Sequence, residues 1–400
     1  MPEFKTSPGT RDILAPHSAR WRAFQEVFAR TVEAAGYSYI IPPMFEDLDV
    51  FLRLGEATEV VTKEMYDFHD KGGRHVALRP EQTASVCRAF VEHRPTTPWK
   101  VWYSGPNFRY EKPQQGRYRQ FDQVGVEALG ADDPLLDAEV IALAAKFYAD
   151  LGLRKVHLSI NTLGDEGDRE KYSQQLSSYL TANEKSLTAE SRATLERNPL
   201  RVLDSKREPD QKVIAGAPAI RDSISATANE HFEAVLQSLD ALNIKYEINN
   251  RLVRGLDYYR HTAFEFVTDR LGAQGTVLGG GRYDGLIENL GGPATPAVGW
   301  AAGIERLAML IEQLPVQQLE AMIVLENDAG LGQAFALLRQ LRQAGISADM
   351  IATGSPKKRY DKAVKQNPAA ILRVNENGYY GFSGEDTNSP LMNFLKSLAP

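Results

Sequence analysis

Apolar side chains recur every three to four residues between positions 18 and 35, the spacing of one face of an α-helix. The apolar positions are 21, 24, 27, 28, 32 and 35, and Gly36 can end the helix in a left-handed conformation. Residues 37–44 read YSYIIPPM, a short apolar strand that two prolines bring to an end. The pattern therefore predicts a helix followed closely by a strand.

The middle of the chain alternates between strand-like and helical patterns. Residues 76–129 contain two β-rich runs, VWYSGPNF and FDQVGVEAL, joined by a charged segment at 111–120 that is typical of a hairpin connection. Asp133 and Pro134 then begin a helix that ends at Gly152. The remaining predicted elements are strands at 158–160, near 245, at 263–268 and at 276–278, followed by three glycines and a helix from about 303 to 312.

Two changes of pattern suggest domain boundaries. Residues 165–243 are helical and rather polar, so they interrupt the strand-rich part as an inserted subdomain. After a predicted linker at 315–319, strands at 321–325, 348–351 and 369–374 alternate with helices at 331–344 and 357–365, as in a small α/β domain. We therefore divide the chain into a core (1–164 and 244–314), an insertion (165–243) and a C-terminal domain (320–400).

Composition narrows the class of protein without identifying it. The chain is 43% hydrophobic and 24% charged, as in ordinary globular proteins, and its net charge of -6 argues against indiscriminate coating of nucleic acid. The single cysteine, Cys87, excludes an internal disulfide and a cysteine-rich zinc site. The first residues do not resemble a signal peptide, and no run of about 18 apolar residues could span a membrane. A cytoplasmic protein with no membrane partner is expected.

The histidines and serines offer no familiar catalytic pattern. The seven histidines lack metal-binding spacing, and no nucleophile motif is present, so we expect no structural metal held by Cys or His and no covalent catalysis.

Candidate chemistry begins in the charged hairpin connection. Cations crowded in one loop repel each other unless an anion offsets them. The strand that follows places Gln123 and Glu127 on one face, where buried polar groups need partners. A ligand with negative phosphates and a positive amine would satisfy both sets, and a solvated charged turn fits the spacing equally well. The loop cations are Arg109, Lys112, Arg117 and Arg119.

Three later segments carry further candidates. LVRGLDYYRHTAFEF at 252–266 gathers Arg254, Asp257, Tyr258 and Tyr259 on a turn before a strand, although a surface arginine with packing tyrosines is an alternative. GGGRYDGL at 279–286 has neither dinucleotide nor P-loop spacing, so its glycines indicate close approach of the backbone to a ligand or a tight turn. AVGWAAGIERLAML at 297–310 leads a small-residue strand into a helix bearing Arg306, alternatively a surface residue of that helix.

Taken in order, these segments resemble the class II aminoacyl-tRNA synthetases, and specifically the histidyl-tRNA synthetase family, from about residue 5 to residue 314. FRYEKPQQGRYRQFDQVGVE at 108–127 resembles class II motif 2, and AVGWAAGIERL resembles motif 3. RGLDYY at 254–259 resembles the block that distinguishes the histidine enzymes. Further family-like blocks are GTRDILAP at 9–16, GEATEVVTKEMYDF at 55–68, LRPEQTA at 78–84 and ERNPLRVLDSK at 196–206.

The resemblance implies roles for individual residues. Arg109 would bind the α-phosphate of ATP with Arg254, the catalytic arginine, on the opposite side. Arg306 would bind the γ-phosphate, Glu111 belongs to the same ATP-binding set, and Arg117 would approach the acceptor end of the tRNA. The histidine pocket would hold the α-ammonium with Glu81 and Gln123 and the imidazole with Glu127 and Tyr259, beside Thr83, Tyr258, Gly281 and Tyr283.

The same resemblance implies a fold and a reaction. We expect an α+β fold, an antiparallel β-sheet core of the class II synthetase type flanked by helices, with a helical insertion and a short, divergent α/β domain related to anticodon-binding domains. The carboxylate of histidine would attack the α-phosphorus of ATP, with Mg²⁺ as cofactor, before the histidyl group passes to tRNA(His). Motif 1 implies a homodimer, for which residues 31–44 are the candidate interface.

Two features depart from the family pattern. Gln82 occupies a position where glycine is expected, so its side chain must point away from the pocket. The C-terminal domain is short, and a helix bearing Lys357, Lys358, Arg359, Lys362 and Lys365 either contacts RNA phosphates or is a solvated face. The alternatives are a non-catalytic paralogue such as the regulatory subunit of ATP phosphoribosyltransferase, an adenylating enzyme that does not charge tRNA and, least favoured, an RNA-binding module.

Overall fold

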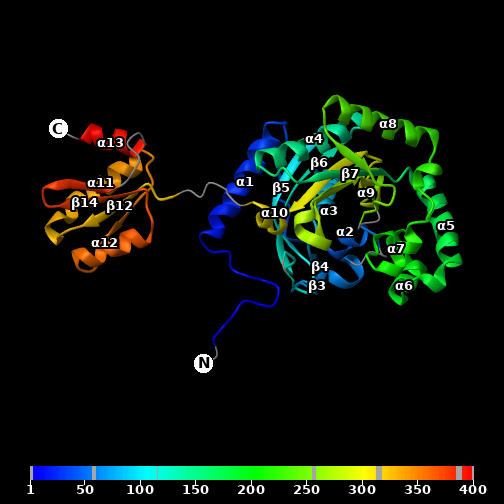
Figure 1. Cartoon of the computed structure of the whole chain (residues 1–400), viewed down its shortest axis with the longest axis horizontal. Coiled ribbons are helices and arrows are strands. Elements are labelled where there is room, and N and C mark those ends of the chain that lie inside the picture. The colour runs from blue at the N-terminus through cyan, green and yellow to red at the C-terminus, as the bar shows by residue number, and fades with distance from the viewer. Residues whose placement is uncertain are drawn as a thin grey trace. The chain divides into compact units, whose positions relative to one another are not determined.

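The chain forms two compact units, Met1–Leu314 and Pro315–Pro400 (Figure 1). The computed structural model describes residues 3–55, 60–114, 116–254, 258–311, 318–383 and 390–398, without the side chains of 273–274, 380–383 and 397–398. Asp257 and parts of the predicted linker 315–319 and of the block 55–68 lie outside these residues. Within them, no helix combines the length and apolar character needed to cross a membrane.

An eight-stranded sheet forms the centre of the first unit, in the order β1-β5-β6-β11-β10-β9-β7-β8. The six inner strands are antiparallel, whereas β1 pairs with β5, and β7 with β8, in parallel. The expected antiparallel core is confirmed for the six inner strands, and each edge adds a strand that pairs in parallel. The strands are β1 Ser38–Tyr39, β5 Trp99–Phe108, β6 Gln120–Leu129, β7 His157–Thr162, β8 Tyr246–Ile248, β9 Arg260–Val267, β10 Thr276–Arg282 and β11 Ala297–Gly303.

Strand alternation sorts the side chains of this sheet between two faces. Trp102 and Val126 belong to one apolar cluster, whereas the neighbouring Tyr103 belongs to the other. The first cluster is closed by α1 (His17–Glu33), α4 (Pro134–Asp150), α8 (Ala226–Ala241) and α10 (Ile304–Leu310). The helices predicted at 18–35 and 303–312 are thus present, with ends shifted by one or two residues.

The other face carries shorter helices and a small second sheet. These helices are α2 (Leu48–Leu52), α3 (Thr83–His93) and α9 (Leu286–Asn289), and the sheet has the order β2-β4-β3, from β2 (Phe45–Asp47), β3 (Tyr66–His69) and β4 (His75–Leu78). A π-helical turn spans Val60–Glu64. Helix α3 was not predicted, because residues 76–129 were expected to be strand-rich.

The segment 165–243 is helical, and its helices divide between the two clusters. Phe232 and Val235 of α8 pack against α4 within the first cluster of the sheet. The preceding helices pack with the second cluster. They are α5 (Glu166–Ala182), α6 (Ala189–Arg197) and α7 (Glu208–Ile214), with 3₁₀ turns at Glu184–Ser186, Pro199–Asp204 and Ile220–Asp222.

The second unit is a four-stranded sheet with a helix layer on each face. The strand order is β13-β12-β14-β15, with β12 parallel to β13 and β14, and β15 antiparallel to β14. One apolar cluster joins the sheet to α11 and α13, and a smaller one joins it to α12. The elements are β12 Ala321–Leu325, α11 Leu331–Gln343, β13 Ala348–Ile351, α12 Pro356–Lys365, β14 Ala370–Asn375, β15 Gly378–Ser383 and α13 Pro390–Leu398.

Candidate active site

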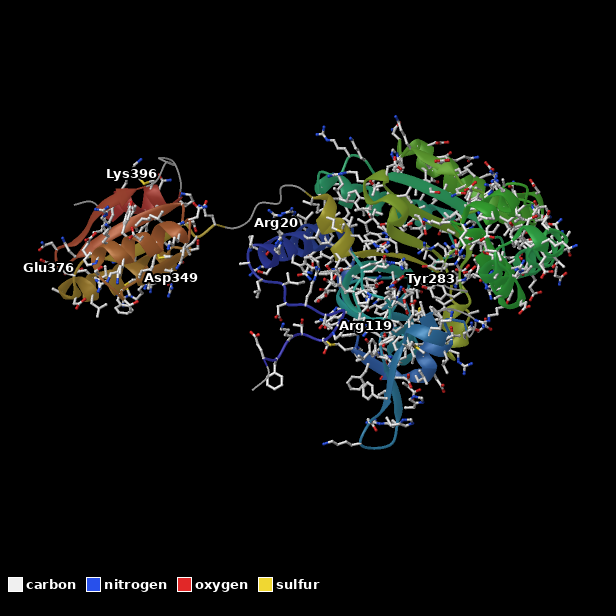
Figure 2. All side chains as sticks on the ribbon, turned by 60° about the horizontal axis from the view of Figure 1, so that its bottom comes forward. Arg20, Arg119, Tyr283, Asp349, Glu376 and Lys396 are labelled. Atoms are coloured by element: carbon white, nitrogen blue, oxygen red, sulfur yellow. The ribbon has the colours of Figure 1, made fainter. Side chains whose placement is uncertain are left out.

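A cavity of about 290 Å³ lies over β6, β10 and β11 of the central sheet. Twelve of the thirteen residues that the resemblance placed in the ATP, histidine and tRNA sets line it, Gly281 being the exception. They come from the start of α3, the loop between β5 and β6, β6 itself, the segment before β9, the turn after β10 and the start of α10. Figure 2 labels Tyr283, which lies in the side-chain-rich interior of the first unit. The twelve are Glu81, Thr83, Arg109, Glu111, Arg117, Gln123, Glu127, Arg254, Tyr258, Tyr259, Tyr283 and Arg306.

One half of the cavity is organised around the fully buried carboxyl group of Glu127. Its Oε1 accepts hydrogen bonds from the hydroxyls of Thr83 at 2.7 Å and Tyr103 at 3.1 Å, and its Oε2 accepts one from the Tyr283 hydroxyl at 2.5 Å. Burial raises the pKa of Glu127 to about 8, and the three hydroxyl donors offset only part of that effect. A ligand group that donates a proton or carries positive charge would stabilise the ionised form of this carboxyl.

Glu81 lies where α3 begins and is fixed by that helix. Its carboxylate oxygens accept the backbone N–H groups of Thr83 at 2.7 Å and Ala84 at 2.8 Å, which suits an anion at a helix N-terminus. Burial nevertheless raises the pKa of Glu81. The neighbouring Gln82 donates from Nε2 to the Gly105 carbonyl at 3.4 Å and does not line the cavity. The unusual glutamine therefore points away from the cavity, as the sequence argument required.

Cationic side chains gather in the other half of the cavity. Arg109 donates from Nε to a backbone carbonyl at 2.9 Å, and Arg306 donates from Nη1 to the carbonyl of Thr276 at 2.8 Å. Arg117 forms an ion pair with Glu111 at 3.2 Å. Burial and the neighbouring charge of Arg117 lower the pKa of Arg306. A bound anion would relieve this crowding of positive charge.

Arg254 also lines the cavity, beside the ring of Tyr259. Its Nη1 makes an ion pair with Glu265 Oε1, and its guanidinium carbon lies 5.4 Å from the centre of the Tyr259 ring. Burial opposes the charged form, but Glu265 and the two neighbouring phenols raise the pKa of Arg254 overall. The cavity therefore keeps a permanent positive charge at this position.

Two glycines leave the room that these side chains occupy. A Cβ on Gly299 would lie 1.8 Å from Glu127 Oε2, and a Cβ on Gly279 would lie 2.1 Å from Arg254 Nη2. Gly281 behaves differently, because a Cβ there would meet the Thr262 carbonyl at 2.5 Å, and Gly281 does not line the cavity. The expectation that Gly281 lines the pocket was wrong, since its neighbours in the sheet fill the space beside it.

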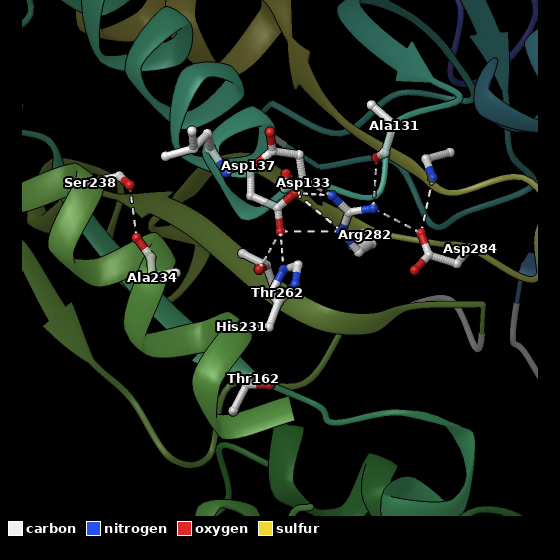
Figure 3. A network of polar contacts seen from close by, with 12 residues as sticks. Ala131, Asp133, Asp137, Thr162, His231, Ala234, Ser238, Thr262, Arg282 and Asp284 are labelled. Carbon is white, nitrogen blue, oxygen red and sulfur yellow. Dashed lines mark hydrogen bonds and ion pairs between the residues drawn. The ribbon is translucent and has the colours of Figure 1, made fainter. Parts of the chain in front are cut away.

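A buried polar network braces the strand that leads to Tyr283 (Figure 3). The fully buried guanidinium of Arg282 donates from Nη2 to Asp137 Oδ1 at 2.5 Å. The other carboxylate oxygen of Asp137 accepts the Thr262 hydroxyl at 2.6 Å and lies 3.0 Å from His231 Nε2. Although burial opposes it, hydrogen bonding to His231 and the charge of Arg282 lower the pKa of Asp137. Helices α4 and α8 are thereby joined to β9 and β10 directly beside the cavity.

Several residues of the cavity wall were not predicted from the sequence. Phe121 is one that the available signal could have found, because strand alternation places it on the same face as Gln123 and Glu127. Its ring lies 5.3 Å from the guanidinium carbon of Arg109. By contrast, Arg119 of the predicted cationic loop does not line the cavity and stacks on Tyr110 instead, with 3.8 Å between its guanidinium carbon and the ring centre. Other lining residues that were not predicted are Tyr118, Thr276, Trp300 and Glu305.

The sequence matches a family model described as histidyl-tRNA synthetase over residues 9–307. A histidine–tRNA ligase of Novosphingobium aromaticivorans is 49% identical over 374 residues, which cover 92% of this chain and 89% of that protein. A histidine–tRNA ligase of Gluconobacter oxydans is 47% identical over 368 residues, covering 91% of this chain and 89% of that one.

Solved structures give the same picture of the fold. An apo histidyl-tRNA synthetase from S. aureus superposes with a TM-score of 0.77 at 35% identity, covering 94% of this chain and 92% of that chain. A Bacillus halodurans protein titled as an ATP phosphoribosyltransferase regulatory subunit or histidyl-tRNA synthetase superposes with a TM-score of 0.70 at 21% identity, covering 94% and 99%. At that identity, the second comparison bears on the fold alone.

Proposed function

The chain belongs to the histidyl-tRNA synthetase family, and we propose that its cavity is where histidine is joined to ATP. The protein is an aminoacyl-tRNA synthetase that activates histidine and charges tRNA(His). The observation that carries the assignment of the site is that one cavity is lined both by the hydroxyl groups that surround Glu127 and by Arg109, Arg117 and Arg306, whose charges act on one another. A substrate pair with an ammonium and an imidazole on one side and a triphosphate on the other matches this division.

Histidine would lie in the half built around Glu127. The α-ammonium would bind Glu81 and Gln123, whose Oε1 is already fixed by a 2.6 Å hydrogen bond from Asn107. The imidazole would bind Glu127 and Tyr259, with Thr83, Tyr258 and Tyr283 closing the pocket around the ring. A site that pairs both imidazole nitrogens rejects analogues that lack them, because its own buried polar groups would then be left without partners.

ATP would lie in the half lined by arginines. Arg109 and Arg254 would hold the α-phosphate from opposite sides, Arg306 would hold the γ-phosphate, and Glu111 would belong to the same set. Fixed guanidiniums stabilise charge that grows on the phosphorus without reorganising during the reaction. The histidine carboxylate is already ionised, so no protein base is needed, and positioning supplies most of the acceleration.

Mg²⁺ is proposed as the cofactor on the grounds of this chemistry. Among the described residues, no cluster of three or more His, Cys, Asp or Glu side chains could hold a metal alone. This donor set fits an ion held mainly by substrate phosphates with one or two carboxylates, which is how Mg²⁺ is commonly bound. Glu111, which lines the cavity beside Arg117, would contribute a carboxylate. When bound, Mg²⁺ neutralises phosphate charge.

The tRNA would contact both units. We propose that Arg117 approaches the acceptor end and that the second unit binds the anticodon region through α12. Lys357, Lys358, Lys362 and Lys365 of that helix are exposed. Arg359 was wrongly grouped with these lysines, because it is buried and donates to the Leu325 carbonyl at 2.8 Å and to Asp328 at 3.1 Å.

We propose a cytoplasmic homodimer whose interface includes residues 31–44. Strand β1 lies at the edge of the central sheet, and large apolar side chains around it are exposed. The exposed fractions are 49% for Tyr39, 76% for Ile41 and 52% for Met44. A second copy of the chain would cover this apolar surface. A monomer in light scattering at micromolar concentration would contradict the dimer.

We also propose that the core 1–164 and 244–314 catalyses both steps, that the insertion 165–243 is a helical subdomain, and that the domain 320–400 contacts tRNA. The test of the site is histidine-dependent exchange between ATP and pyrophosphate in Arg254→Ala. We expect a loss on the order of a hundredfold or more, as when a preorganised charge donor is removed. Near-normal exchange would reject the catalytic role of Arg254.

Charging of tRNA tests the second unit separately. Replacing Lys358 and Lys362 by glutamate is expected to raise the KM for tRNA(His) and to leave pyrophosphate exchange unchanged. The double variant Arg339→Glu/Lys396→Glu is the matched control, since it makes the same charge change at exposed positions of α11 and α13. An unchanged KM in the variant of Lys358 and Lys362 would show that α12 does not contact the tRNA.

A further inference from the structure

We infer that Glu265 and Thr276 are positioning residues that hold Arg254 and Arg306 in place for the phosphates of ATP. The inference rests on the ATP-binding roles proposed above for these two arginines. Neither Glu265 nor Thr276 is among the residues that the family resemblance indicates. Both come from the inner strands β9 and β10, where the register of the sheet fixes them.

Glu265 supports Arg254 from outside the cavity. The Arg254–Glu265 ion pair joins side chains that are only 16% and 18% exposed. Arg254 lines the cavity whereas Glu265 does not, so the carboxylate holds the guanidinium on the side away from a bound phosphate. Gly279 lies directly opposite Glu265 in the β9–β10 pair and leaves room for Arg254 Nη2. Glu265 thus provides the counter-charge for Arg254, and Gly279, its partner across the two strands, leaves the space for it.

Thr276 connects this support to the second arginine. Its hydroxyl donates to Glu265 Oε2 at 2.8 Å, which fixes the carboxylate that Arg254 contacts. Its backbone carbonyl accepts a hydrogen bond from Arg306 Nη1, also at 2.8 Å. Thr276, at the start of β10, therefore supports both guanidiniums. Its side chain supports Arg254 through Glu265, and its main chain contacts Arg306 directly.

The support has a physical purpose in this cavity. A free arginine side chain has many rotamers, so holding it before ATP arrives lowers the entropy lost on binding. Arginines held in place also stabilise the developing charge without moving during the reaction. Glu265 cannot act by binding substrate phosphate, since both are anions. Its effect on the reaction therefore passes through Arg254.

The experiment measures adenylate formation by the full-length protein in single turnovers without tRNA, with the concentrations of histidine and ATP each varied up to saturation. Glu265→Gln keeps the shape of the side chain and removes its charge. We expect its rate constant to fall by about tenfold, with the KM values for histidine and ATP changed by less than about threefold. Thr276→Val keeps the main-chain contact to Arg306 and removes only the hydroxyl, so a smaller loss of about threefold is expected.

A double-mutant cycle separates positioning from a general effect on the fold. If Glu265 acts through Arg254, adding Glu265→Gln to Arg254→Ala costs less than about twofold further, because the group that it positions is already gone. The matched control is Glu46→Gln. Glu46 forms an ion pair with Arg88 at 2.6 Å, with side chains 10% and 24% exposed, and does not line the cavity. Its rate should equal that of the parent protein.

The outcomes distinguish the inference from the function on which it rests. A normal rate in Arg254→Ala would overturn the proposed role of that arginine. A slow Arg254→Ala with normal Glu265→Gln and Thr276→Val would overturn the inference alone. Equal losses from Glu265→Gln in the presence and absence of Arg254 would also overturn it, because they would show an effect through the fold. Should Glu265→Gln fail to fold, the same cycle with Thr276→Val decides.

Discussion

Replacing Glu127 by glutamine is expected to stabilise the protein at alkaline pH while removing histidine binding. In the folded protein without substrate, burial raises the pKa of Glu127 to about 8, whereas a glutamate in the unfolded chain has a pKa of 4.5. The folded state therefore holds this proton more tightly than the unfolded state does. Its contribution to the free energy of unfolding is complete below pH 4.5, decreases as the pH rises and is lost above pH 8.

The size of the effect follows from the interval between the two pKa values. Each pH unit between 4.5 and 8 removes about 1.4 kcal/mol, so the ionised carboxylate costs the folded protein on the order of 5 kcal/mol. Glutamine resembles the protonated carboxyl in shape and does not ionise. The variant should therefore match the parent protein near pH 5 and exceed its stability by roughly 2–5 kcal/mol at pH 8.5.

Urea denaturation followed by tryptophan fluorescence measures this difference in the relevant unit, because Trp21, Trp99, Trp102 and Trp300 all lie in the first 314 residues. Glu305 and Glu81 also have raised pKa values because they are buried, so the comparison is between the two proteins rather than between two pH values. Added histidine should stabilise the parent protein and leave the variant unchanged. A stability difference that does not grow between pH 5 and pH 8.5 would refute the reasoning.

Three further perturbations test other parts of the structure. Gly299→Ala would bring a Cβ to 1.8 Å from Glu127 Oε2, so the KM for histidine in pyrophosphate exchange should rise more than about tenfold. The control is Gly332→Ala, because that glycine has open space around it. An unchanged KM in Gly299→Ala would contradict the tight packing. Asp137→Asn leaves the buried Arg282 without its counter-charge and should lower the free energy of unfolding by about 3–5 kcal/mol in urea. A loss below about 1 kcal/mol would exclude a bracing role for Asp137. Ile41→Glu should convert the proposed dimer to a monomer in sedimentation, and an unchanged dimer would place the interface elsewhere.

The local pattern of apolar and polar residues was sufficient to predict those elements whose partners in the fold lie close in sequence. The hairpin of β5 and β6 follows from two β-rich runs separated by a charged connection, and α1 follows from its apolar periodicity. The parallel edges could not be predicted in this way. Residues 38–39 pair with residues 101–102, and residues 158–160 pair with 246–248, so their partners lie about sixty to ninety positions away. Neither local pattern indicates which strand the segment pairs with.

The same distinction applies to the cavity. The residues that the sequence identified are those of unusual type in unusual places, such as Arg109 in a cationic loop and Glu127 facing inward from a strand. Glu265 is a charged residue in an ordinary alternating strand, and Thr276 is a common strand residue, so neither stands out. Their relation to Arg254 and Arg306 appears only when β9 and β10 are placed in register. Supporting residues are therefore the part of the site that sequence reasoning finds last.

The glycines of β10 and β11 leave space both for a residue that the sequence identified and for one that a supporting residue holds. Because glycine is a poor strand former, the strand was predicted to end before residue 279. The glycines at 279–281 were expected to form a turn or to allow contact with a ligand. In the structure they lie inside β10, paired on both sides by β9 and β11. The side chains that occupy the space above Gly279 and Gly299 belong to the protein itself, namely Arg254 and Glu127. The glycines were thus correctly expected to allow close approach of another group to the backbone. That group is a side chain of the site, Arg254 or Glu127, and it occupies the space before any substrate binds.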